Sequence, residues 1–64
     1  MKNKSADFVL DVLVSRTRDK VRHWEYCINV HKKLEPHDKL GIAHMEGIYI
    51  AYMNTLNMLE RQKE

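Results

Sequence analysis

The sequence predicts an all-α fold, an antiparallel two-helix hairpin that self-associates into a four-helix-bundle homodimer. Three observations lead to this prediction. Apolar residues recur every three or four positions in both halves of the chain, which is the period of an amphipathic α-helix. The single proline, Pro36, stands between the two periodic segments. The second segment carries more apolar residues than one helix face can bury.

The first helix is predicted over residues of about 5–34. Its main apolar stripe follows alternating spacings of four and three and consists of Leu10, Val14, Thr17, Val21, Trp24, Ile28 and His31. Leu13, Cys27 and Leu34 are expected to widen this stripe on one side. Ser5 is placed to cap the helix N-terminus, and Asp7 suits the positive end of the helix dipole.

The connection between the helices is predicted at about residues 34–37. Pro36 disfavours helical backbone angles at Glu35, so the first helix should end there. Asp38 is either the N-cap of the second helix or an acidic residue in its first turn. The second helix should then span about residues 37–61. So short a connection requires the helices to lie antiparallel, as one domain covering residues 1–64.

The second helix has apolar residues on two sides. Thirteen of the twenty residues from Leu40 to Leu59 are apolar, whereas one face of such a helix needs roughly eight or nine. The broader side, here called the seam face, is the predicted core and self-association surface and comprises Ile42, Met45, Ile48, Tyr49, Tyr52, Leu56 and Leu59. The opposite side, here called the outer strip, comprises Leu40, Ala43, Gly47, Ile50, Ala51, Asn54 and Met58. A small domain with surplus apolar surface usually oligomerises, so we expect a homodimer with the second helix at its centre. The alternative is that the outer strip binds a different protein.

Three small residues within the outer strip form a close-packing row. Ala43, Gly47 and Ala51 are spaced by four residues and therefore lie on one line along the helix. Such a row lets another backbone or a large ring approach closely. Three occupants are open: the ring of Trp24, the same row of a second copy across a two-fold axis, or a helix of another protein.

Basic residues of the first helix suggest a second function. Residues 1–34 carry a net charge of +4 and residues 35–64 a net charge of −2. The candidate contacts to a partner or to nucleic acid are Arg16, Arg18, Lys20 and Arg22. A basic helix binds phosphates by releasing counterions. A nucleic-acid-associated dimer is therefore the first alternative.

A metal-linked helical assembly is the second alternative. His23, Cys27 and His31 are spaced by four residues, and one adjacent pair on a helix can share a zinc or copper ion. His23 and His31 lie about 12 Å apart along a helix, so all three cannot bind one ion. No metal ligand and no cofactor is therefore assigned.

Composition and motifs exclude several other classes. A single cysteine cannot form an internal disulfide, and no apolar run approaches the roughly 18 residues that cross a bilayer. The basic start of the chain is soon followed by Asp7 and Asp11, which argues against a signal peptide. No phosphate-binding glycine loop and no catalytic motif occurs, so we do not expect an enzyme. The sequence favours a cytoplasmic protein-interaction module, a regulator, adaptor or inhibitor that acts sterically as a helical dimer.

Overall fold

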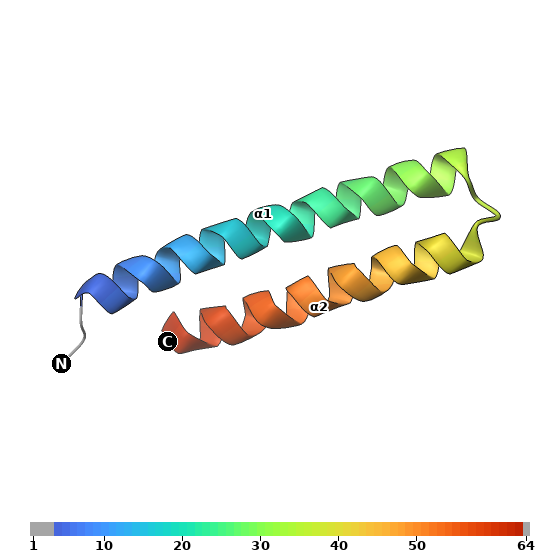
Figure 1. Ribbon diagram of the computed structural model, residues 1–64. Coiled ribbons are helices and arrows are strands. Elements are labelled where there is room, and N and C mark those ends of the chain that lie inside the picture. Colours follow the sequence, from blue (N-terminus) through green and yellow to red (C-terminus); the bar gives the residue numbers. More distant parts are fainter. Residues whose placement is uncertain (1–3, 64) are drawn as a thin grey trace.

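The computed structural model describes residues 4–63 and shows two long helices lying side by side (Figure 1). Helix α1 spans Lys4–Leu34 and helix α2 spans Lys39–Lys63. The chain reverses direction between them, so the predicted antiparallel helical hairpin is confirmed. The molecule is a rod with extents of 53 × 14 × 12 Å, and the first turns of α1 project beyond the end of α2 (Figure 1). The first three residues, which entered the prediction about a signal peptide, lie outside the described residues.

The core is one line of side chains between the two helices. On α1, Val14, Val21 and Ile28 are 4%, 7% and 7% exposed, and their spacing of seven residues places them along a single side. Leu56 of α2 is 7% exposed and packs in the same cluster as Val14 and Val21. Partly buried residues pack around this cluster: Leu10, Tyr49, Tyr52, Met53 and Leu59. No described side chain is completely buried, so the seam is shallow.

The buried stripe of α1 is narrower than expected. Leu13 and Leu34 are 44% and 73% exposed, and Cys27 is only half-buried. At about 100° per residue, Leu13 and Leu34 lie roughly 80–120° around the helix from the buried line. One neighbouring helix covers only the side that faces it, so these positions remain in contact with solvent.

The N-terminal end of α1 differs slightly from the expectation. The helix begins at Lys4, so Ser5 lies within its first turn and not before it as an N-cap. Asp7 stands in that first turn, where a carboxylate interacts favourably with the helix dipole. The last turn is basic and contains His31, Lys32 and Lys33, which complements the negative end of the same dipole.

The turn shows why α2 begins at Lys39 and not at residue 37. Asp38 is the N-cap, because its Oδ1 accepts a hydrogen bond of 3.0 Å from the backbone N–H of Gly41. The backbone oxygen of Asp38 also accepts the first helical hydrogen bond, from the N–H of Ile42 at 3.0 Å. Pro36 therefore lies in the turn itself, ahead of the cap. This resolves the two roles considered for Asp38 in favour of the cap.

Among the side chains that the structure describes, Arg18 and Lys32 of α1 form ion pairs with α2 along the edges of the seam. Arg18 Nη2 lies 3.5 Å from Glu60 Oε1, and Lys32 Nζ lies 3.9 Å from Glu46 Oε2. All four side chains are about half exposed, and such pairs contribute about 0–1 kcal/mol each. The hairpin is therefore held mainly by apolar burial along the seam. Within residues 4–63, neither helix has the length and apolarity needed to span a membrane.

Candidate interaction surface

The seam face of α2 is directed at α1. Leu56 is buried, and the other members are half-buried: Ile42, Met45, Ile48, Tyr49, Tyr52 and Leu59. These residues pack within one chain, where they complete the contact between the two helices. An association through α2 would therefore use a different side of this helix.

The outer strip is the side of α2 that no residue of the described range 4–63 covers. Leu40, Ile50 and Met58 are 84%, 56% and 64% exposed, although each is a large apolar side chain. The other members of the strip, Ala43, Gly47, Ala51 and Asn54, are exposed as well. From Leu40 to Met58 the strip runs about 27 Å along the helix. The apolar residues of α2 are less concentrated on one face than those of α1, as two opposite apolar sides require.

Trp24 does not occupy the close-packing row. A Cβ atom added at Gly47 would meet nothing within 4 Å, so no indole atom lies over this position. Trp24 is half-buried on α1, on the other side of α2 from the row. The prediction that the Trp24 ring fills the close-packing row is therefore wrong at Gly47. The row remains open to another molecule.

The other glycine of α2 has a role inside the chain. A Cβ atom at Gly41 would come 2.8 Å from Cγ and 3.0 Å from Oδ1 of Asp38, closer than such atoms approach. The absence of a side chain at Gly41 lets the Asp38 carboxylate fold over the helix start as its cap. No contact among the described residues explains in the same way why a glycine stands at position 47.

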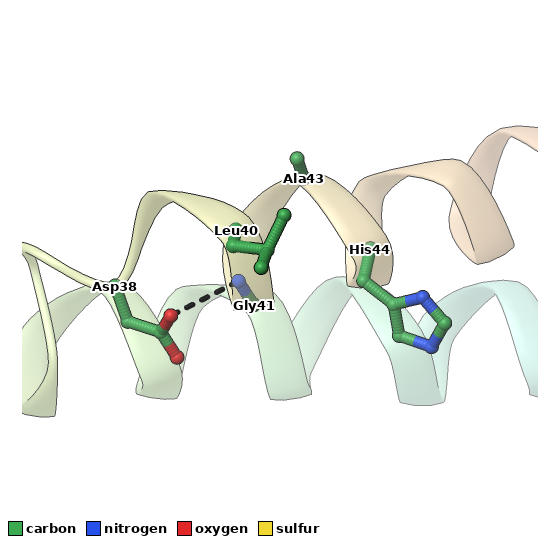
Figure 2. Close-up of a pocket in the computed structure, with 5 residues that line it drawn as sticks. All are labelled: Asp38, Leu40, Gly41, Ala43 and His44. Carbon is green, nitrogen blue, oxygen red and sulfur yellow. Dashed lines mark hydrogen bonds between the residues drawn. The ribbon is translucent and has the colours of Figure 1, made fainter.

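A shallow, open depression lies at the turn end of the outer strip. Its lining consists of Asp38, Leu40, Gly41, Ala43 and His44. Figure 2 shows these residues on the turn and the first turns of α2, with the Asp38 carboxylate bonded to the Gly41 nitrogen. The depression thus extends the apolar outer strip up to the cap of the helix.

A side-chain hydrogen bond ties the two helix ends together at the turn. His31 Nε2 lies 2.9 Å from Asp38 Oδ2, while the other oxygen of the same carboxylate accepts from Gly41 N–H. Two hydrogen bonds lower the pKa of Asp38 below its ordinary value of 3.8, because both stabilise the carboxylate. The bond from the Gly41 N–H has the larger effect, and the bond from His31 has the smaller one. The apolar period of the first helix predicts His31 on the seam and does not reveal this hydrogen bond. The signal that could have found it is a histidine in the last turn of one helix followed, after a short turn, by an acidic N-cap.

The basic residues of α1 do not form one face. Arg16, Arg18, Lys20 and Arg22 are all exposed. At about 100° per residue, Arg16 and Lys20 lie on one side of the helix and Arg18 and Arg22 on nearly the opposite side. Arg18 is also paired with Glu60. The structure brings no more than two of the four to the same side of the molecule.

The structure does not bring His23, Cys27 and His31, the three residues of the metal alternative, together. Cys27 Sγ lies 3.5 Å from His23 Nε2 on α1, and the His23 ring meets Trp24 edge-on, with centroids 5.8 Å apart. His31 is bonded to Asp38 at the turn instead. Within residues 4–63, no group of three or more histidine, cysteine, aspartate or glutamate side chains is arranged to hold a metal ion.

The outward side of α1 also carries apolar residues. Phe8 and Tyr26 are 69% and 68% exposed, and Val9 is 53% exposed. Charged residues such as Asp19 interrupt this side of the helix between Phe8 and Tyr26. It is therefore a less continuous apolar surface than the outer strip of α2.

No protein-family model, curated protein sequence or solved structure matches this chain. The candidate site therefore follows from the geometry of the hairpin alone. That geometry points to an interaction surface, the outer strip of α2, with Gly47 near its middle.

Proposed function

We propose that this chain is a small, non-enzymatic protein-interaction module, a regulator, adaptor or inhibitor, that works as a homodimer. The observation that carries the proposal is the uncovered outer strip of α2, with Leu40, Ile50 and Met58 each more than half exposed. Contiguous apolar surface of this kind marks an interaction site on a soluble protein. A four-helix bundle with α2 of each copy at its centre would cover it.

The total surface area supports association. The chain exposes 5406 Å². A compact monomer of 7.7 kDa exposes about 4,300 Å². The surplus is about 1,100 Å², whereas a typical stable interface removes about 800 Å² from each partner. One second copy seated on the outer strip would therefore remove most of the surplus.

The mode of action is steric. An assembly of four helices offers a rigid outer surface that includes the outward side of each α1, and occupying a binding site on a target blocks or bridges it. Exposed Phe8 and Tyr26 provide apolar contacts on that outer surface, and aromatic residues are enriched at the centres of protein interfaces. A cytoplasmic location belongs to the proposal, because the free thiol of Cys27 suits a reducing compartment.

Light scattering behind a sizing column, over a hundredfold range of concentration, tests the association. We expect a mass near twice 7.7 kDa for the native chain. Ile50→Lys places a charge in the outer strip and should shift the mass to that of a monomer. Ser15→Lys is the matched control, because Ser15 is exposed on α1, more than about 90° around the helix from the buried line, and should leave the dimer intact. A monomer at every concentration would contradict the proposal.

Binding to duplex DNA, measured by fluorescence anisotropy at several salt concentrations, separates the nucleic-acid alternative. Binding that weakens steeply as salt rises would favour that alternative over a protein partner. Because Arg16 and Lys20 face away from Arg18 and Arg22, we expect no such binding at physiological salt.

A further inference from the structure

We infer that the second copy lies antiparallel along the outer strip, with the two-fold axis passing between Gly47 and Ala51. The four helices then follow the order α1, α2, α2 of the partner, α1 of the partner. This inference rests on the proposed homodimer and specifies which surface forms it and in which direction the chains run.

The direction of approach follows from the position of the strip. At about 100° per residue, the outer strip is centred roughly 180° around α2 from the seam face. In a bundle with a square cross-section, each helix contacts two neighbours on sides about 90° apart. Here the two contact sides of α2 are opposite, so α2 is sandwiched between its own α1 and the second copy. Seating the copy there covers Leu40, Ile50 and Met58 without disturbing the seam.

The order of residues in the strip permits an antiparallel two-fold pairing. Leu40 and Met58 stand nine residues before and after Tyr49, and Gly47 and Ala51 stand two residues before and after it. Reversing the strip about this centre places Leu40 level with the partner's Met58, and Gly47 level with the partner's Ala51. Large side chains then meet at the two ends, and Gly47 and Ala51 lie beside the axis, where the backbones come closest. The two Ile50 side chains, at the edge of the strip, flank this centre.

Gly47 supplies independent support for a close neighbour. Glycine inside a helix costs about 1 kcal/mol relative to alanine. Gly41 is accounted for by the carboxylate that fills the space of its absent side chain, whereas the space at Gly47 is empty within the chain. A second backbone crossing at Gly47 is an occupant that would use that space.

Charge distinguishes the antiparallel from the parallel arrangement. Arg61 is exposed and continues the line of the outer strip one turn beyond Met58. In a parallel dimer the two Arg61 side chains would lie side by side and repel each other. In the antiparallel dimer each Arg61 lies level with residue 37 of the partner, where the partner's Glu35 and the partner's Asp38 carry two negative charges against one positive charge on the partner's Lys39. Each Arg61 thus meets a segment, residues 35–39, with a net charge of −1.

Disulfide cross-linking tests the arrangement. In a Cys27→Ser background, whose dimer mass is checked first, one chain carries Leu40→Cys and another carries Met58→Cys. In the antiparallel dimer, two copies of residue 40 lie about 27 Å apart, far beyond the roughly 7 Å between Cα atoms that a disulfide allows. Mild oxidation should therefore link the two variants to each other at least tenfold more than either links to itself.

Each other outcome overturns the inference in a recognisable way. Self-linking of Leu40→Cys and of Met58→Cys would show a parallel dimer, so the homodimer would stand and the antiparallel arrangement would fail. A dimer by light scattering without any cross-link would place the interface away from the outer strip. A monomer by light scattering would remove the proposed homodimer together with the inference.

Discussion

Replacing Gly47 with alanine is expected to stabilise the single chain and weaken its association at the same time. The added Cβ meets nothing within 4 Å in the hairpin, so the substitution should gain the full difference in helix propensity, about 0.8–1.0 kcal/mol. For a chain of 64 residues, 1 kcal/mol raises the unfolding midpoint by about 7 °C. In the antiparallel dimer the same methyl group would separate two closely packed backbones. Overpacking costs about 1–3 kcal/mol, which weakens the dimer by about fivefold to more than a hundredfold.

The identical change at Gly41 provides the comparison. There the new Cβ would crowd the Asp38 carboxylate, which would have to swing aside and give up its bond to the Gly41 nitrogen. The gain in helix propensity is then offset by the loss of the cap, so Gly41→Ala should be clearly less stable than Gly47→Ala. Because Gly41 lies far from the middle of the outer strip, Gly41→Ala should change the stability of the dimer little.

Urea unfolding followed by circular dichroism, at low and at hundredfold higher protein concentration, measures both effects. At low concentration the free energy of unfolding reports the single chain, and its rise with concentration reports association. Ala51→Gly should show a loss of about 1 kcal/mol at low concentration. A Gly47→Ala chain that is less stable than the native chain at low concentration would refute the reasoning, because it would mean that something within the chain already fills that space.

Three further predictions follow from the hairpin. Leu56→Ala should lower the free energy of unfolding, measured with urea, by about 2–4 kcal/mol. Leu40→Ala, measured in the same way at low concentration, should change it by less than about 0.5 kcal/mol. Equal losses would contradict the assignment of Leu56 to the core. Because folding lowers the pKa of Asp38, its contribution to stability is present above pH 3.8 and is lost as pH falls through the folded-state value. Asp38→Asn keeps an N-cap that does not titrate. Between pH 5 and 2, the helicity of this variant, measured by circular dichroism, should therefore fall less than that of the native chain. Parallel curves for the two chains would show that the Asp38 carboxylate does not contribute to the pH dependence. Arg18→Ala should cost at most about 1 kcal/mol in a urea titration, since its ion pair with Glu60 is half exposed.

The hairpin itself could be predicted from the sequence because its causes are local. The period of the apolar residues specifies two helices, and Pro36 separates them. The sequence predicts the start of α2 two residues early, because a proline is also compatible with the first turn of a helix. The hydrogen bond from the Gly41 N–H is needed to identify Asp38 as the cap. Leu13 and Leu34 were assigned to the buried stripe because their hydrophobicity does not reveal how wide a side one neighbouring helix covers.

For the surface residues, the side of the helix on which each lies could be predicted, whereas the groups that it contacts could not. The two apolar sides of α2 follow from 100° per residue, and the structure turns one of them toward α1 and the other toward solvent. What lies over Gly47 depends on where the Trp24 side chain points, which the spacing of residues does not determine. The tie between His31 and Asp38 depends on the path of the turn, which brings together two residues seven positions apart.

The turn has a kinetic consequence as well as a structural one. It is short, it carries the cap of α2, and the bond between His31 and Asp38 joins the last turn of α1 to the cap of α2. Each contact further along the seam closes only a slightly larger loop once the previous one has formed, so the chain can fold progressively from the turn toward its two ends. Proteins built from such local helical contacts fold in microseconds to milliseconds. Amide exchange reports local stability instead, so it should be slowest around the buried cluster of Val14, Val21 and Leu56. It should quicken toward the first turns of α1, where that helix extends beyond α2 and a short unsupported helix is only marginally stable.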